Sequence, residues 1–222
     1  MSSFKSSEIR WMFDGELNRG VESWFKDGEF EPSIQERKDQ YLIFPGMKFV
    51  GIKLRESKLE FKPLIQSNVV TLPELGSGKV ELWEKWSIEK SAAGDFLHSF
   101  AGTDPHHWIS VYKKRMLRKY SCVGDVVKEI DVSKRPAEGC GIEITELKIP
   151  NPLNHVGNDQ VKYWTFGFEA FGNDENTATI LDKTVKEFFH NNLLEKLDDF
   201  SLLVKDSMSY PEFLFNLLEE TR

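Results

Sequence analysis

Closely spaced charged side chains recur through the first two thirds of the chain. They are the basic pair Lys53 and Arg55, the mixed pairs Glu8 with Arg10, Glu60 with Lys62 and Glu81 with Lys85, and, further along, Glu143. Lys and Arg donate hydrogen bonds to phosphate oxygens, and carboxylates supply the oxygen ligands that Mg²⁺ and Mn²⁺ prefer. Gathered in one enclosed space, these side chains would hold a phosphorylated ligand and stabilise the charge that develops during phosphoryl transfer.

An ordinary half-buried antiparallel sheet also carries charged side chains at every second position, where they point into water. Taken one strand at a time, this solvated face is the simpler interpretation. The pattern recurs on several segments, however, and closure of the strands into a barrel would turn one face of each toward a common lumen. The Phe- and Trp-rich faces would then pack beneath helices, and the charged faces would line the interior.

The segments that carry these residues alternate apolar and polar side chains, which predicts β-strands. The eight predicted strands cover about residues 7–13 and 38–44, the two arms of a hairpin within 49–64 that turns at 56–58, and about 80–88, 107–120, 141–149 and 161–171. The stretch 71–79, which contains Gly76 and Gly78, is expected to form a loop.

Apolar residues at helical spacing predict three helices. One spans about residues 17–25 and a second about 176–197, and the third begins near Ser209, where Pro211 and Glu212 form a helix-start signal. Each apolar stripe needs a partner surface. We therefore expect the helices to lie against the sheet or barrel and not to form a separate domain.

The composition describes a folded, acidic protein. Of its 222 residues 40% are hydrophobic, and the 17 Phe and 6 Trp require a packed interior. The net charge of −7 argues against general attraction to nucleic acid or to an anionic membrane, and no stretch of spanning length is free of charge. A local basic pocket is compatible with this balance, so the expected partner is an anionic small molecule.

Two cysteines, Cys122 and Cys140, are too few for a disulfide framework. The first residues of the chain carry no apolar run of signal-peptide length. We therefore expect a cytoplasmic protein with free thiols. If the two cysteines occupy neighbouring strands, a chance pair in a reducing compartment is the simplest interpretation.

Taken in order, these short charged pieces resemble the strands of the CYTH-like, or triphosphate tunnel metalloenzyme, superfamily. The matching pieces span most of residues 7–171 and are Glu8-x-Arg10, Lys53-x-Arg55, Leu59-Glu-Phe-Lys62, the Glu-x-x-Glu-Lys of 81–85, the basic strand from Lys113 to Arg118, Gly141-Ile-Glu143-Ile-Thr-Glu146, and Glu169. The resemblance implies one α+β domain over residues 1–222. Its fold would be an eight-stranded antiparallel tunnel-like barrel with helices packed outside, including C-terminal helices at about 175–221.

The resemblance also implies which side chains act. It assigns ligand binding to Arg10, Lys53, Arg55, Lys62, Lys85, Arg115 and Arg118, and metal binding to Glu8, Glu60, Glu143 and Glu169, with Mg²⁺ or Mn²⁺ as cofactor. The implied function is binding of a polyphosphate or phosphorylated small molecule. Metal-dependent hydrolysis of the triphosphatase type is the activity that the family would add.

The first strand departs from the family signature, Glu-x-Glu-x-Lys. The corresponding run here is Glu8-Ile-Arg10-Trp-Met12, so a base replaces the second acid and methionine replaces the lysine. One metal-binding carboxylate and one phosphate-binding lysine are thereby lost. The change is consistent with a relative that binds an anionic ligand without hydrolysing it, or that has altered specificity.

Two other functions fit the same sequence. A curved sheet that grips a long C-terminal helix, with many aromatic residues, would suit a non-enzymatic binding module with an aromatic pocket for a small hydrophobic ligand, as in helix-grip folds. Alternatively, the Phe-rich C-terminal helix would dock on a partner chain. The direction in which the Lys53/Arg55 strand points, into a lumen or into solvent, separates these interpretations.

Overall fold

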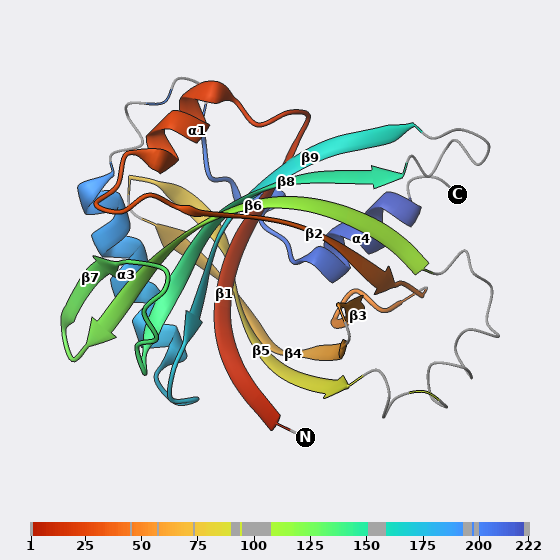
Figure 1. Cartoon of the computed structure of the whole chain (residues 1–222), viewed down its shortest axis with the longest axis horizontal. Coiled ribbons are helices and arrows are strands. Elements are labelled where there is room, and N and C mark those ends of the chain that lie inside the picture. The colour runs from red at the N-terminus through yellow and green to blue at the C-terminus, as the bar shows by residue number, and fades with distance from the viewer. Residues whose placement is uncertain are drawn as a thin grey trace.

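The computed structural model describes residues 2–44, 46–56, 58–72, 74–89, 94, 108–150, 159–192, 197 and 200–219 (Figure 1). The strands in these residues are β1 (Ser2–Asp14), β2 (Ser33–Leu42), β3 (Val50–Arg55), β4 (Lys58–Leu72), β5 (Gly76–Glu89), β6 (Trp108–Val123), β7 (Val126–Ile130), β8 (Gly139–Pro150) and β9 (Gln160–Phe171). The helices are α1 (Arg19–Lys26), α3 (Thr177–Asn191) and α4 (Tyr210–Glu219), with a 3-10 turn, η3 (Val204–Asp206).

Eight of the described strands close into an antiparallel barrel. Their order is β2-β3-β4-β5-β1-β9-β8-β6, and β6 pairs back onto β2 from Ser33 opposite Leu117 to Leu42 opposite Trp108. Strand β7 pairs with the free edge of β6 as a hairpin. The closed barrel with its helices confirms the predicted α+β, tunnel-like fold.

The predicted strands are all present among the described residues, but several local predictions were wrong. Strand β2 begins at Ser33, five residues before its predicted start. Gly76 and Gly78 belong to strand β5, not to a loop. Strand β7 was missed, because Val126–Ile130 is a short edge strand with little alternation. The long helix ends at Asn191, where the next residue, Asn192, turns its side chain toward Arg118 on β6; the predicted extension to 197 falls largely outside the described residues.

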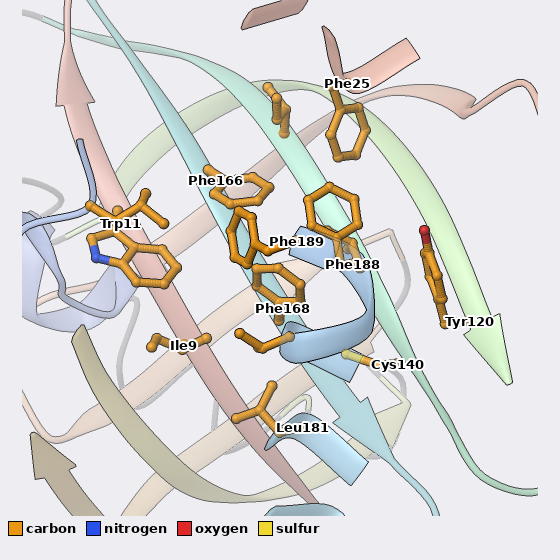
Figure 2. Packing of buried hydrophobic residues seen from close by; sticks show 14 of the residues in the cluster. Ile9, Trp11, Phe25, Tyr120, Cys140, Phe166, Phe168, Leu181, Phe188 and Phe189 are labelled. Atoms are coloured by element: carbon orange, nitrogen blue, oxygen red, sulfur yellow. The ribbon is translucent and has the colours of Figure 1, made fainter. Parts of the chain in front are cut away.

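The outward faces of β1, β6, β8 and β9 form an aromatic core beneath α1 and α3. Trp11, Phe166 and Phe168 are almost fully buried there, and Phe188 of α3 packs on Phe166 and Phe168 with ring centroids 6.0 and 5.5 Å apart. Figure 2 shows these rings converging between the strands and the helix. Cys122 and Cys140 lie in the same core on neighbouring strands, both as free thiols.

Helix α4 occupies a different place, across one end of the barrel (Figure 1). Its Phe213 and Leu214 pack with the inward-facing Met12, Leu147 and Ile149 in a second apolar cluster. Helix α3 therefore packs outside, as predicted, whereas α4 turns its apolar face toward the barrel interior. Within the described part of the chain, no helix has the length and apolarity that a membrane crossing requires.

Candidate functional site

Because side chains alternate along each strand, the aromatic outer face leaves the charged residues on the inner face. Between the two mouths, eight cations and six carboxylates of the described residues point inward. The cations are Arg10, Arg37, Lys53, Arg55, Lys62, Lys85, Lys113 and Arg115; the carboxylates are Glu8, Asp39, Glu60, Glu81, Glu143 and Glu169. These inward-facing residues thus include two more basic than acidic side chains, in a chain whose net charge is −7.

The densest group of cations surrounds a single carboxylate, Asp39, which is fully buried. Arg55 donates two hydrogen bonds to it, 3.0 Å long from Nε and 3.1 Å long from the terminal nitrogen. Lys113 Nζ lies 3.2 Å and Arg37 Nε 3.7 Å from its oxygens. Lys53 completes what we call the Asp39 cluster: Arg37, Asp39, Lys53, Arg55 and Lys113.

Burial and the neighbouring charges together shift the pKa values in the Asp39 cluster. Burial would raise the pKa of Asp39, but the surrounding cations, Lys113 foremost, hold it well below its ordinary range. Burial, and then repulsion from Arg55, lowers the pKa of Lys53 to about 8. Burial also lowers the pKa of Lys113 well below its ordinary value, against the attraction of Asp39. A further anion in this space would relieve the repulsion.

A second ion-pair group lies on β1, β6 and β8. Glu143 accepts a 2.7 Å hydrogen bond from Arg10 and a 3.2 Å hydrogen bond from Arg115. Burial would raise the pKa of Glu143, but these two guanidinium groups hold it well below its ordinary range. The Nε atoms of Arg37 and Arg115 are buried and lack a hydrogen-bond partner among the described residues, so both retain a free donor.

Three carboxylates stand side by side across β9, β1 and β5. Glu8 is directly opposite Glu169 on one side and Glu81 on the other, and we call these three residues the carboxylate row. Lys62 bonds to Glu8 and lies 4.0 Å from Glu169. Burial, with a contribution from Glu8, raises the pKa of Glu81 to about 7, although Trp83 donates a 3.1 Å hydrogen bond to it.

The structure brings together most of the side chains singled out in the sequence. Arg10, Lys53, Arg55, Lys62, Lys85 and Arg115 line the interior with Glu8, Glu60, Glu143 and Glu169, and Glu60 accepts a hydrogen bond from Lys85 at 2.8 Å. Arg118 lies on the opposite face of β6. It is buried against Phe25 and bonds to Glu129 at 2.8 and 2.5 Å, outside the barrel.

The sequence reasoning missed Arg37 and Asp39, and it named Lys113 in the basic strand without assigning it a ligand-binding role. Strand parity was the signal that could have found them. Arg115 and Arg118 are three residues apart and so face opposite sides, whereas Lys113 and Arg115 share a face. On β2, Arg37 and Asp39 share the face of Tyr41, but the strand was predicted to begin only at residue 38.

The space left inside the barrel is small. A cavity of about 60 Å³ is lined mainly by charged side chains of β1, β3, β4 and β5, together with Ser209, Tyr210 and Pro211 at the start of α4. A water molecule in the liquid takes about 30 Å³. The cavity is therefore of the size of a few waters, and a ligand with several phosphates would have to displace the internal carboxylates from their cations.

Whether the interior suits a divalent cation depends on its carboxylates. No group of three or more His, Cys, Asp and Glu in the described ranges is arranged to hold a metal ion by itself. Mg²⁺, however, is commonly bound by one or two carboxylates together with ligand phosphates. Glu8 and Glu169, directly opposite each other on β1 and β9, match that smaller requirement.

The comparisons with known proteins add no close relative. No family model matches the chain, and no curated protein matches it. A chain of the Schizosaccharomyces pombe Mediator head module is similar at 8% identity, with 90% of this chain and 98% of that chain covered and a TM-score of 0.47.

Two triphosphatase structures are also similar. HpAC1 from Hippeastrum, a putative adenylyl cyclase with a dominant triphosphatase activity, has 8% identity over 86% of this chain and 87% of its own, with a TM-score of 0.39. The S. pombe Pct1 RNA triphosphatase, in complex with the Spt5 CTD, has 10% identity over 90% of this chain and 85% of its own, with a TM-score of 0.38. Likeness at this level says nothing about activity. What the chain itself shows is a closed eight-stranded antiparallel barrel with a charged interior.

Proposed function

We propose that the barrel interior binds a polyphosphate or a phosphorylated small molecule. The Asp39 cluster carries this proposal, because Arg37, Arg55 and Lys113 all lie within 4.0 Å of one buried carboxylate, and Lys53 beside them pairs with Glu60. Buried charge is costly unless it is paired. A barrel that encloses more cations than carboxylates is therefore better suited to a multiply charged anion than to remaining empty.

Internal carboxylates would act as counter-ions until the ligand arrives. Glu60 illustrates this role: it forms ion pairs with Lys53 at 3.0 Å and with Lys85 at 2.8 Å, and the surrounding cations outweigh its burial and lower its pKa to about 2. Phosphate oxygens accept several charge-assisted hydrogen bonds at once. A phosphate chain could thus take over the donors of Lys53, Lys85 and Arg55 as Glu60 swings aside.

Metal-dependent hydrolysis is the finer form of this proposal. Glu8 and Glu169 would hold Mg²⁺ or Mn²⁺ together with ligand phosphate oxygens, and the cation would neutralise charge on those oxygens when bound. The chain's own contribution would be binding and orientation. Lys62, which now bonds to Glu8, would be released to donate to the ligand, and Arg10 would remain fixed by Glu143 at the inner end.

The hydrophobic-ligand alternative finds less support. The aromatic side chains that suggested a pocket pack against α1 and α3, with Phe166, Phe168 and Phe188 fully buried in the core. The Phe-rich stripe of α3 is used in the same packing. An apolar ligand or a docking partner would have to displace this core.

Thermal unfolding with tripolyphosphate, in the presence and absence of Mg²⁺ or Mn²⁺, tests the proposal. At a ligand concentration about a hundred times Kd, binding to the native state stabilises it by about 2.7 kcal/mol. The double variant Lys53→Ala/Arg55→Ala should lose this shift and still fold. A matched double variant outside the barrel, Lys26→Ala/Lys186→Ala, should keep it, because these side chains are exposed on α1 and α3. A normal shift in the Lys53/Arg55 variant would place the site elsewhere.

A further inference from the structure

Three strand edges lack a partner strand among the described residues. Strand β4 continues past β3, which pairs with it only as far as Pro63, and residues 66–72 of β4 pair with β5 alone. Strand β2 pairs with β3 only near its own end, so residues 33–39 also have one free edge. Strand β7 pairs with β6 alone. Each free edge presents backbone N–H and C=O groups that another strand could take up.

The free edges of β2 and β7 carry charged side chains, which keep an exposed edge from pairing with another strand. These side chains are Glu36, Arg37, Lys38 and Asp39 on β2, and Lys128 and Glu129 on β7. The corresponding part of β4, residues 64–72, contains no charged residue, proline or glycine. Of the three edges left free by the described strands, the one on β4 therefore lacks this protection. We call its residues 66–72 the β4 edge.

Side chains on both faces of this part of β4 are accessible. Every residue from Ile65 to Val69 is exposed, and the exposed fractions of these two apolar residues are 52% and 66%. Because neighbouring residues of a strand point to opposite faces, a run of exposed residues means that the described residues cover neither face there. The irregularity in the pairing with β5 lies before Gln66, and from Gln66 to Leu72 the pairing is continuous. The β4 edge is therefore a regular strand that is ready to accept a partner.

The residues of the β4 edge are nearly symmetric in kind about Val69. Val69 is the middle residue of the regular segment, and the hydroxyl residues Ser67 and Thr71 lie two positions away from it on the same face. If a second copy of the chain paired antiparallel about this position, Val69 would lie opposite its own equivalent, and Ser67 would lie opposite Thr71. Pairs of β-branched residues and pairs of Ser with Thr both stabilise neighbouring strands. The β4 edge is thus complementary to itself.

The two charged edges are not complementary to themselves. Pairing of β2 with a second copy about the middle of residues 33–39 would place Glu36 opposite the Glu36 of that copy. Pairing of β7 about its middle residue would place Lys128 opposite Lys128 in the same way. Like charges directly opposite each other destabilise a strand pair. Among the three free edges of the described strands, self-pairing without such a conflict is therefore available to the β4 edge alone.

We propose that the β4 edge is a self-association site, at which two copies of this chain pair antiparallel about a twofold axis at Val69 and join their barrel walls into one sheet. The same surface is used on both copies, as a closed twofold dimer requires. Pairing of one strand from each copy buries little surface, so the dimer should be reversible and should depend on protein concentration. The proposal is independent of phosphate binding, because no residue of the β4 edge belongs to the Asp39 cluster or to the carboxylate row.

Sedimentation velocity of the full chain, at concentrations from about 1 μM to about 1 mM, tests the proposal. The unaltered protein should shift from monomer to dimer over this range. Val69→Lys should weaken dimerisation at least about tenfold, because the introduced lysines would face each other at the axis. Val126→Lys is the matched control and should dimerise like the unaltered protein, since Val126 is 55% exposed on the free edge of β7. Both altered side chains are exposed, so thermal unfolding should show that both variants fold.

Disulfide formation tests the register. With oxidised glutathione, Val69→Cys should link two copies, because residues directly opposite each other on antiparallel strands lie close enough to be bridged. Val126→Cys should stay largely unlinked, and the native Cys122 and Cys140 are buried and should not compete. Equal linking of the two variants, or a dimer unchanged by Val69→Lys, would overturn the proposal. So would a protein that stays monomeric at about 1 mM, which would leave the β4 edge to a strand of a different protein.

Discussion

On strand β9, Phe166 and Phe168 point outward into the aromatic core beneath α3, whereas Thr165 and Glu169 point into the barrel with the ionic side chains. Phe166, Phe168 and Thr165 are all fully buried. The outer face is stabilised mainly by apolar contact, with the Arg118–Glu129 ion pair at its edge, whereas the inner face needs a partner for many charges. Burial therefore has different consequences on the two faces of the barrel wall. On the outer face it gives apolar packing, and on the inner face it holds charged side chains close together.

The largest expected effect is on the outer face. Phe166→Ala should reduce the free energy of unfolding by about 4 kcal/mol, because it leaves a cavity beneath α1 and α3. Urea denaturation measures this change. Phe61→Ala is the matched control, since Phe61 is 38% exposed on β4 and should cost much less. Equal losses in the two variants would show that the aromatic core is not the main source of stability.

On the inner face, Asp39→Asn should cost about 3 kcal/mol, because it leaves Arg37, Arg55 and Lys113 without the carboxylate that they surround. The comparison becomes sharper with ligand present. Tripolyphosphate should stabilise this variant more than the unaltered protein, since a phosphate would replace the lost charge. The exposed Asp182→Asn on α3 is the control for general effects of charge. A smaller ligand shift in Asp39→Asn would argue against an anion site beside that residue.

Arg115 and Arg118 are three residues apart on β6, and they lie on the inner and the outer face of the barrel wall. Arg118→Ala should lower the free energy of unfolding by about 2 to 3 kcal/mol, because buried Glu129 loses its partner. Arg115→Ala should lower the free energy of unfolding by less, but it should weaken tripolyphosphate binding by about tenfold. Denaturation measures the free energy of unfolding of each variant, and titration measures its affinity for tripolyphosphate. If Arg118→Ala weakened binding as much as Arg115→Ala, the division into two faces would fail.

The smallest effect concerns pH and Glu81. Its pKa is raised from 4.5 to about 7 in the folded protein, so the unfolded chain releases this proton first as pH rises. Glu81 therefore lowers stability increasingly from about pH 4.5 up to pH 7. Glu81→Gln should remove this component, and its gain over the unaltered protein should be larger at pH 8 than at pH 5. A gain independent of pH would contradict the raised pKa.

Alternation along the chain was enough to predict the eight barrel strands and to divide most of their residues between two faces, since every second side chain shares a face whatever the tertiary structure. It also placed Lys53, Arg55 and Lys62 on one side and Val50, Ile52 and Leu54 on the other. On β6 the same alternation was overlooked. Arg118 was grouped with Arg115, although the two residues face opposite sides of the strand.

Closure of the barrel determined the features that alternation along the chain could not predict. Whether a charged face meets water or a lumen depends on the pairing of β2 with β6. This pairing runs from Ser33 opposite Leu117 to Leu42 opposite Trp108, and neither segment carries a local sign of the other. The same pairing brings Asp39 to Lys113, and the packing of α4 against the barrel brings Tyr210 to Arg10. Local propensity is set by neighbours in sequence, whereas charge crowding arises only when distant segments share one small volume.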